Sequence, residues 1–342
     1  MADTDARTVT PGAASTTKKR QWHYCPQLPI EVSPLFARPF RPLAIARWFV
    51  GGWLPLSEKL VILGLAILSW VFFSPTLEQC REFSFDWIAL IYLRNLALMF
   101  VVAGGLHLYF YVFRRQGDER HYDARPMARN NRVFTFNDQV LDNMFWSCAS
   151  GVTLWSAYEA LMMWALANGY APALFWPENA GWLILLILLV PIWETFYFYL
   201  IHRLIHWPPL YRSVHYLHHR NINVGPWSGL SMHPLEHLIY LGSVMIHFVV
   251  PANPLLIIYH LQHFTLSAAT THTGYEGLLI RGRIRLRLGT FHHQMHHRFF
   301  ECNYGGLEIP WDKWMGSFHD GSTESHQQFL QRRKLKAQQS QG

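Results

Sequence analysis

Histidine is unusually dense between residues 202 and 297, where 15 of the chain's 20 histidines lie. Two stretches, HYLHH at 215–219 and HHQMHH at 292–297, share a His-x-x-His-His pattern. On a helix, residues three and four apart lie on one face. Neutral imidazole is the commonest metal ligand among side chains. The spacing therefore predicts a metal site rather than histidines scattered through a core.

The number of rings favours two metal ions rather than one. HRLIH and HPLEH add pairs with i, i+4 spacing, and HTGYE contributes one more ring, His272. A single ion with four to six ligands cannot use eight or more histidines, whereas two ions can. His237 shares the helical face of His233 and competes with it, or with His272, as a ligand. We therefore expect a dimetal centre rich in imidazole.

The choice of metal depends on the chemistry expected of the site. Imidazole suits zinc, copper, iron and nickel alike. Attack on an unactivated C–H bond of a lipid requires redox chemistry with O2, which iron can perform and zinc cannot. Iron is the consistent choice, with a membrane zinc-dependent lipid hydrolase as the alternative. A haem protein or transporter would need only two of the histidines.

The composition indicates a polytopic membrane protein. Hydrophobic residues make up 51% of the chain and charged residues 15%, against roughly 25% charged in soluble domains. The four cysteines show no CxxC spacing and predict neither a disulfide framework nor a thiolate zinc site. The net charge of +7 comes without a nucleic-acid-binding motif. It indicates loops that face anionic lipid, and no nucleic-acid partner.

The histidines must be positioned by helices that precede and separate them. The apolar segments are near the roughly 20 residues that span a bilayer. They cover about 57–75, 86–113, 145–168 and 181–201. A further apolar stretch, about 238–271, is interrupted by PANP and predicts a re-entrant hairpin. We expect an all-α polytopic protein with about four transmembrane helices, this hairpin, and a cytosolic helical cap that holds the dimetal site.

Charged residues set the expected orientation. The loop 114–132 contains six arginines and should be cytoplasmic, so four spans return the chain to the same side at His202. Arg94 and Glu159 lie inside predicted spans, where mutual pairing and a functional role are equally plausible. The expected organisation has four parts. A disordered tail and Pro-rich surface segment (1–47) is followed by transmembrane helices (48–190). A histidine-box domain (191–318) and a polar C-terminal tail (319–342) complete the chain.

HRLIH, HYLHH and HHQMHH, together with HPLE and HTGYE, resemble the histidine boxes of the fatty acid hydroxylase/sterol desaturase superfamily. The resemblance covers about 190–315 and includes NYGGLEIPWDKWMGSF. It implies a membrane-bound non-haem di-iron enzyme that uses O2. Trp207 stands where many relatives have a further histidine. Carried over by motif, the metal ligands are His202, His206, His215, His218, His219, His233, His272, His293, His296 and His297.

The resemblance also implies a reaction and partners. The reaction is hydroxylation or desaturation of a sterol, fatty acyl chain or related lipid. Electrons would come from a ferredoxin or cytochrome b5 with its NAD(P)H reductase. The basic segments 114–132 and 281–288 are candidates for docking this donor, and anchoring to anionic lipid is an equally good interpretation of them. A bacterial inner membrane is expected rather than the endoplasmic reticulum. The candidates for supporting the ligands are Glu194, Glu236, Glu276, Asn303 and His292.

Overall fold

The computed structural model describes residues 22–50 and 58–339; the disordered tail predicted at residues 1–20 lies outside them. The described chain is mostly helical, as predicted. Its departure from an all-α fold, within the described residues, is an antiparallel hairpin of β1 (Leu278–Ile280) and β2 (Arg283–Leu286). The fold is thus a helical assembly with one small β-element.

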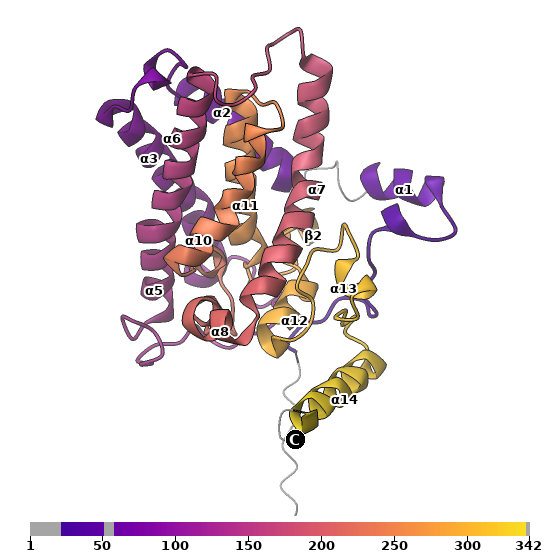
Figure 1. Ribbon diagram of the computed structural model, residues 1–342. Helices are drawn as coiled ribbons and strands as arrows, with labels where there is room; N and C mark the ends of the chain where they lie inside the picture. The colour runs from indigo at the N-terminus through magenta and orange to yellow at the C-terminus, as the bar shows by residue number, and fades with distance from the viewer. Residues whose placement is uncertain (1–21, 51–57, 340–342) are drawn as a thin grey trace, which may run out of the picture.

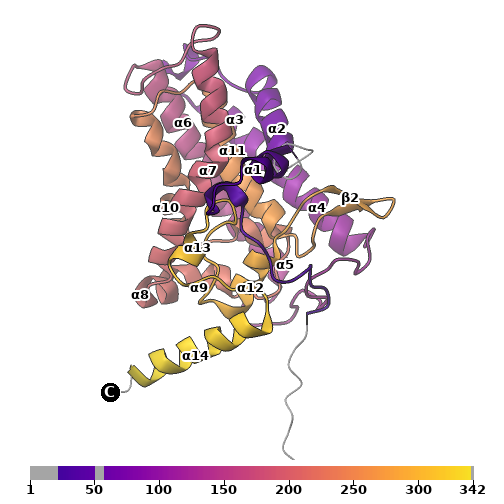
Figure 2. The same cartoon turned by 90° about the vertical axis from the view of Figure 1, so that its right-hand side faces the viewer.

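Long helices stand side by side in one part of the molecule (Figures 1 and 2). They are α2 (Glu58–Phe72), α3 (Phe85–Met99), α6 (Thr153–Ala167), α7 (Ala180–Ile205) and α11 (Pro254–Thr271). Helix α3 continues through π-helical turns and α4 (Gly105–His107) to Val112. Helix α5 (Gln139–Trp146) leads through the π-helical turn Ser147–Val152 into α6. All four predicted apolar segments therefore contain helix.

Two of these helices are long and apolar enough to cross a membrane, Phe85–Val112 and Ala180–Ile205. Large apolar side chains on their surfaces face outward: Trp182, Ile184 and Leu188 on α7 are each more than two-fifths exposed. Contiguous apolar surface of this kind is rare on soluble monomers. The exposed side chains therefore favour a lipid environment around these helices.

Helix α11 forms the centre of the assembly. Every residue from Leu255 to Thr270 is buried, and α11 packs against α2, α6 and α7. The Asn253 side chain accepts a hydrogen bond from the Leu256 N–H and so caps the helix. The other arm of the predicted hairpin comprises α10 (Pro234–Leu241) and the 3-10 helix Gly242–Phe248. The arm of the predicted hairpin formed by α11 is therefore surrounded by other helices of the protein.

An ion pair joins α3 to α6. The guanidinium of Arg94 contacts both carboxylate oxygens of Glu159, and Asn95 Nδ2 donates to Glu159 Oε2 at 3.2 Å. Both charged side chains are almost fully buried. The sequence left open whether Arg94 and Glu159 pair with each other or have a functional role, and the structure shows that they pair.

Shorter elements gather at one end of the long helices (Figure 1). They are α8 (Pro208–Leu210), the π-helical turn Tyr211–His215, α9 (Tyr216–His219), the 3-10 helix Pro226–Leu230, α12 (Phe291–Phe299), α13 (Trp311–Trp314) and α14 (Thr323–Gln339). The N-terminal elements are the 3-10 helix Pro34–Phe36 and α1 (Pro42–Trp48), and a 3-10 turn, Gln79–Arg81, precedes α3. The segments that carry the HRLIH, HYLHH, HTGYE and HHQMHH motifs meet at this end.

Candidate metal centre

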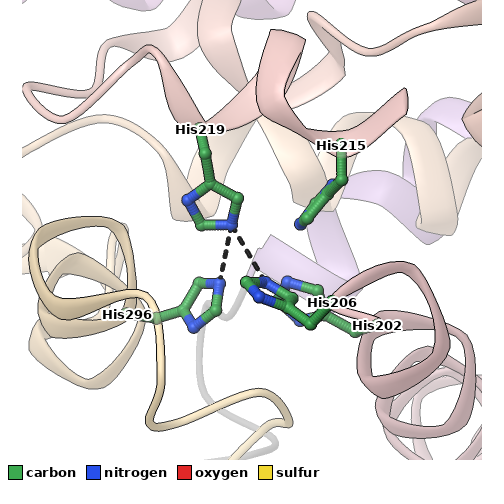
Figure 3. A group of neighbouring side chains, drawn as sticks. All are labelled: His202, His206, His215, His219 and His296. Atoms are coloured by element: carbon green, nitrogen blue, oxygen red, sulfur yellow. Dashed lines mark hydrogen bonds between the residues drawn. The ribbon is translucent and has the colours of Figure 1, made fainter. Parts of the chain in front are cut away.

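Nine of the ten predicted ligands form two compact groups. Within each group the ligand atoms all lie within 4.8 Å of one another. The five-histidine group, shown in Figure 3, consists of His202, His206, His215, His219 and His296. The four-histidine group consists of His218, His272, His293 and His297.

The two His-x-x-His-His motifs divide between the groups in opposite ways. On α9 and the turn before it, His215 and His219 join the five-histidine group, while His218 joins the four-histidine group. On α12, His293 and His297 join the four-histidine group, while His296 joins the other. Residues four apart share a helical face, and the ring between them points to the neighbouring site. Each short helix therefore serves both sites.

Backbone carbonyls hold most of the rings by Nδ1. His202 Nδ1 lies 2.6 Å from the Tyr304 carbonyl oxygen, and His296 Nδ1 lies 2.7 Å from that of Cys302. A carbonyl oxygen only accepts hydrogen bonds, so Nδ1 carries the hydrogen and Nε2 keeps a lone pair. The corresponding pairs in the other group are His272 with Ala268 at 2.7 Å, His297 with Asn221 at 3.1 Å and His218 with Ser231 at 3.3 Å.

The Nε2 atoms then face one another at the centre of each group. His272 Nε2 lies 3.0 Å from His297 Nε2, and both rings already donate through Nδ1. Two lone pairs at this distance repel unless a cation lies between the rings. In the five-histidine group, His219 Nε2 lies 3.1 Å from that of His206 and 3.0 Å from that of His296 (Figure 3). The donor arrangement therefore fits metal ions.

Burial keeps these imidazoles in the neutral form that metals bind. Loss of solvent lowers the pKa of His215 to about 3 and that of His218 to about 4. The pKa of His206 is also lowered, by burial first and then by the neighbouring His215 ring. Rings that remain neutral at physiological pH keep the lone pair required for coordination.

Glu236 holds His215 in place of a carbonyl. Its Oε1 lies 2.8 Å from His215 Nδ1, and the carboxyl is buried. Burial raises the pKa of Glu236 to about 7. A carboxylate behind a ligand histidine fixes the orientation of the ring and increases its basicity.

His233, expected to be a ligand, belongs to neither group. It precedes Pro234 at the start of α10, and its Nδ1 accepts a hydrogen bond from the Leu235 N–H at 3.2 Å. His237 is also outside both groups, because Nδ1 lies 2.9 Å from Ser150 Oγ and Nε2 lies 3.0 Å from the Leu230 carbonyl oxygen. Neither ring joins the other nine, because His233 bonds the backbone at the start of α10 and His237 bonds Ser150 and the Leu230 carbonyl.

The other expected supporting residues make their contacts elsewhere. Glu276 pairs with Arg120 at 2.9 Å. Asn303 Nδ2 donates to the backbone carbonyls of His292 and His319 rather than to a ring. His292 Nε2 lies 3.8 Å from an Asp312 carboxylate oxygen. Glu194 accepts a hydrogen bond from Ser267, as described below.

Asp312 has a structural role that no motif or spacing indicates. Its carboxylate accepts hydrogen bonds from the Tyr304 N–H at 2.9 Å and the Gly305 N–H at 2.7 Å. These bonds fix the loop whose Cys302 and Tyr304 carbonyls hold His296 and His202. A buried aspartate that orders a loop cannot be distinguished by spacing from one on the surface.

Gly229 allows another anchoring carbonyl to take its position. A Cβ at Gly229 would lie 2.0 Å from the Ala268 carbonyl oxygen, which is the acceptor for His272 Nδ1. Only a residue without a side chain permits this approach. The contact of the 3-10 helix Pro226–Leu230 with α11 thus supports the four-histidine group.

A cavity of about 200 Å³ adjoins both groups. His202 and His215 line it from the five-histidine group, and His218, His272 and His293 line it from the other. Phe198 and Met232 contribute apolar surface. A molecule in this cavity would therefore meet both candidate metal sites.

Comparisons with known proteins agree with this geometry. A family model described as fatty acid hydroxylase matches residues 187–317. The match supports the resemblance of the histidine motifs to the fatty acid hydroxylase/sterol desaturase superfamily. The matched residues contain every histidine of both groups, so the superfamily region is the part of the chain that carries the candidate metal centre.

Several curated relatives that the chain matches are named as sterol desaturases. The chain is 32% identical over 139 residues to Delta(7)-sterol 5(6)-desaturase ERG3B of Gibberella zeae, covering 40% of this chain and 42% of that protein. It is 32% identical over 120 residues to the Saccharomyces cerevisiae ERG3 desaturase, covering 35% and 32%. With the tobacco Delta(7)-sterol-C5(6)-desaturase it shares 25% identity over 238 residues, covering 65% and 79%. The match thus spans less than half of these fungal relatives.

No solved structure matches. The names of these relatives describe desaturases and not hydrolases, so they do not favour the zinc hydrolase alternative. The expected bacterial inner membrane gains no support, because these relatives come from fungi and tobacco.

Proposed function

We propose that this protein is a membrane-bound di-iron oxidoreductase that hydroxylates or desaturates a sterol, fatty acyl chain or related lipid. The observation that carries the proposal is the contact between His272 and His297. Their Nε2 atoms lie 3.0 Å apart while each Nδ1 donates to a carbonyl. A cation shared by these rings removes the repulsion, and a second group of facing rings lies beside them.

The nine histidines of the two groups would hold two iron ions. Iron bound there would supply the O2-dependent redox chemistry that C–H oxidation needs. The chain itself orients the rings through backbone carbonyls and Glu236. It also keeps the imidazoles neutral by burial, and a lipid in the cavity would lie beside both groups.

We further propose that α2, the helix Phe85–Val112, the continuous α5–α6 helix and α7 cross the membrane, with the histidine end on the cytosolic side. The arginines of segment 114–132 support this orientation. The domain organisation follows the same division, with transmembrane helices to about residue 190 and the histidine-box domain from 191 to 318.

Electrons would come from a ferredoxin or a cytochrome b5 system. The first basic segment expected to receive the donor, 114–132, contacts the hairpin that carries the second, because the Leu279 N–H donates to Gln116 Oε1 at 2.9 Å and β1 pairs with β2. Arg283 and Arg285 on the adjoining hairpin are exposed. Together these segments offer one basic surface to an acidic protein partner.

Metal analysis of the purified protein tests the proposal. About two iron ions per chain are expected, and lipids from expressing cells should show a gain of one oxygen or a loss of two hydrogens by mass spectrometry. Zinc without iron would contradict the proposal in favour of a hydrolase, and a Soret band would instead indicate haem.

A further inference from the structure

The cavity beside the metal groups has a charged wall. Glu58, Lys59, Glu194, His263 and Glu308 line it, and none of them belongs to either histidine group. We call these five residues the polar wall. Lipid-binding cavities are normally lined by apolar side chains with few polar groups. Removing charged groups from water costs several kcal/mol each, so a functional reason is needed for five ionisable residues here.

Contacts within the polar wall leave the His263 ring without a hydrogen-bond partner. Lys59 Nζ lies 3.4 Å from Glu308 Oε1, and Glu58 accepts a hydrogen bond from Thr270. Glu194 Oε1 accepts a hydrogen bond from Ser267 at 2.8 Å. His263 is 1% exposed. Its Nε2 lies 2.9 Å from Glu194 Oε2, but the contact is not aligned as a hydrogen bond, and both ring nitrogens lack a hydrogen-bond partner.

We infer that Glu194 and His263 bind the polar end of the lipid substrate and that this end is a hydroxyl or an amine. The inference rests on the proposed function and narrows its substrate class. Three carboxylates against one lysine favour a group that donates hydrogen bonds and disfavour a carboxylate or phosphate. A hydroxyl can donate to the Glu194 carboxylate while it accepts from a nitrogen of the buried His263 ring.

The position of this subsite separates the polar end from the oxidised carbon. Glu194 precedes the ligand His202 by eight residues on α7, and His263 precedes His272 by nine along α11. With a helical rise of 1.5 Å per residue, the backbone of Glu194 lies about 12 Å from that of His202 along α7. The substrate is therefore oxidised at a carbon remote from its polar group.

The polar wall also lies where a ligand can reach it. A wider open groove of about 1890 Å³ shares Glu58, Lys59, Thr271 and Glu308 with the cavity. Segments on either side of the groove contribute apolar side chains, including Leu43 and Trp314. A lipid that enters from the groove passes the charged rim before its polar end meets Glu194.

Four probes of equal chain length test the inference: octadecanol, octadecylamine, stearate and octadecane. Their binding to the detergent-solubilised, iron-loaded protein is measured by native mass spectrometry. We expect the alcohol or the amine to bind about tenfold more tightly than the acid and the hydrocarbon, as one charge-assisted hydrogen bond provides. The tighter of the two identifies the polar group.

Variants assign the preference to the polar wall. Glu194→Gln keeps the side-chain shape and removes the charge, and it should abolish the tenfold preference while iron content and octadecane binding stay unchanged. His263→Asn should do the same. Glu178→Gln, at an exposed loop position, is the matched control and should retain the preference.

Equal binding of all four probes by the wild-type protein, or tighter binding of stearate, overturns the inference. A preference that survives both variants also overturns it. Iron content distinguishes failure of this inference from failure of the proposed function. Iron-loaded protein without the preference refutes only the subsite. Protein that binds no iron refutes the di-iron proposal.

Discussion

The two histidine groups use the same donor atoms but are supported differently. In the four-histidine group all rings are buried, and three are held by carbonyls from separate segments, those of Ser231, Ala268 and Asn221. The five-histidine group contains the partly exposed His206, and one of its rings is held by a carboxylate, Glu236. One site is therefore fixed by backbone geometry and has no ring to spare, whereas the other has an extra ring and a charged support.

The difference implies unequal tolerance of ligand loss. His297→Ala leaves three rings in the four-histidine group, whereas His206→Ala leaves four in the other. We expect His297→Ala to lose about half of the bound metal and all lipid oxidation, and His206→Ala to retain most of the metal. Inductively coupled plasma mass spectrometry measures both. Equal metal loss in the two variants would show that the groups do not differ in this way.

The backbone support can be broken without changing a ligand. An alanine at Gly229 forces its Cβ against the Ala268 carbonyl, so His272 loses its acceptor and unfolding becomes easier by about 2 kcal/mol. The four-histidine site should lose its metal while the other retains it. Gly64→Ala, with open space around the new methyl group, is the control. Unchanged metal content in Gly229→Ala would contradict this account of the anchoring carbonyl.

Removing the Glu236 carboxylate should have a smaller effect on metal binding, and this effect is expected in the five-histidine group. Glu236→Ala should weaken metal binding at the five-histidine site by about 10- to 100-fold, because His215 loses its orienting partner. Glu236→Gln keeps an acceptor for Nδ1 and should weaken binding less. A chelator titration followed by metal analysis measures the affinity. Release from the four-histidine site first would argue against the assignment.

The smallest change concerns a histidine outside both groups. His319 stacks on Phe299 of α12, with ring centroids 5.3 Å apart, and His319→Ala should reduce stability by about 1 kcal/mol. Metal content should stay the same, since the ring is no ligand. Thermal unfolding in detergent and metal analysis test this together. Metal loss would mean that α12 depends on this contact for its position.

The spacing of the histidines predicted much of this arrangement. The i, i+4 rule placed His215 with His219 and His293 with His297, and the helical segments fell where apolar residues were continuous. The rule did not separate His218 from its neighbours, because the position of α9 between two sites depends on tertiary packing. It also could not identify the carbonyls of Asn221 or Tyr304, since every residue carries the same backbone groups.

For His233, the motif predicted a ligand, but the ring lies outside both histidine groups. Its motif and spacing resemble those of a ligand, but a histidine directly before Pro234 can also cap the helix that follows, and the structure uses the ring in that way. Sequence alone cannot decide whether such a ring forms a local hydrogen bond or a coordination bond to a distant metal ion.

The opposite division of the two His-x-x-His-His motifs has a consequence for assembly. Since α9 and α12 each contribute to both sites, an ion that enters one site immobilises backbone that the other also needs. The entropy of ordering these helices is then lost once rather than twice. Metal uptake by the unmodified chain should therefore be positively cooperative when metal is limiting, with apo and fully loaded chains predominating. At saturating metal, a variant with one disabled site should still fill the other.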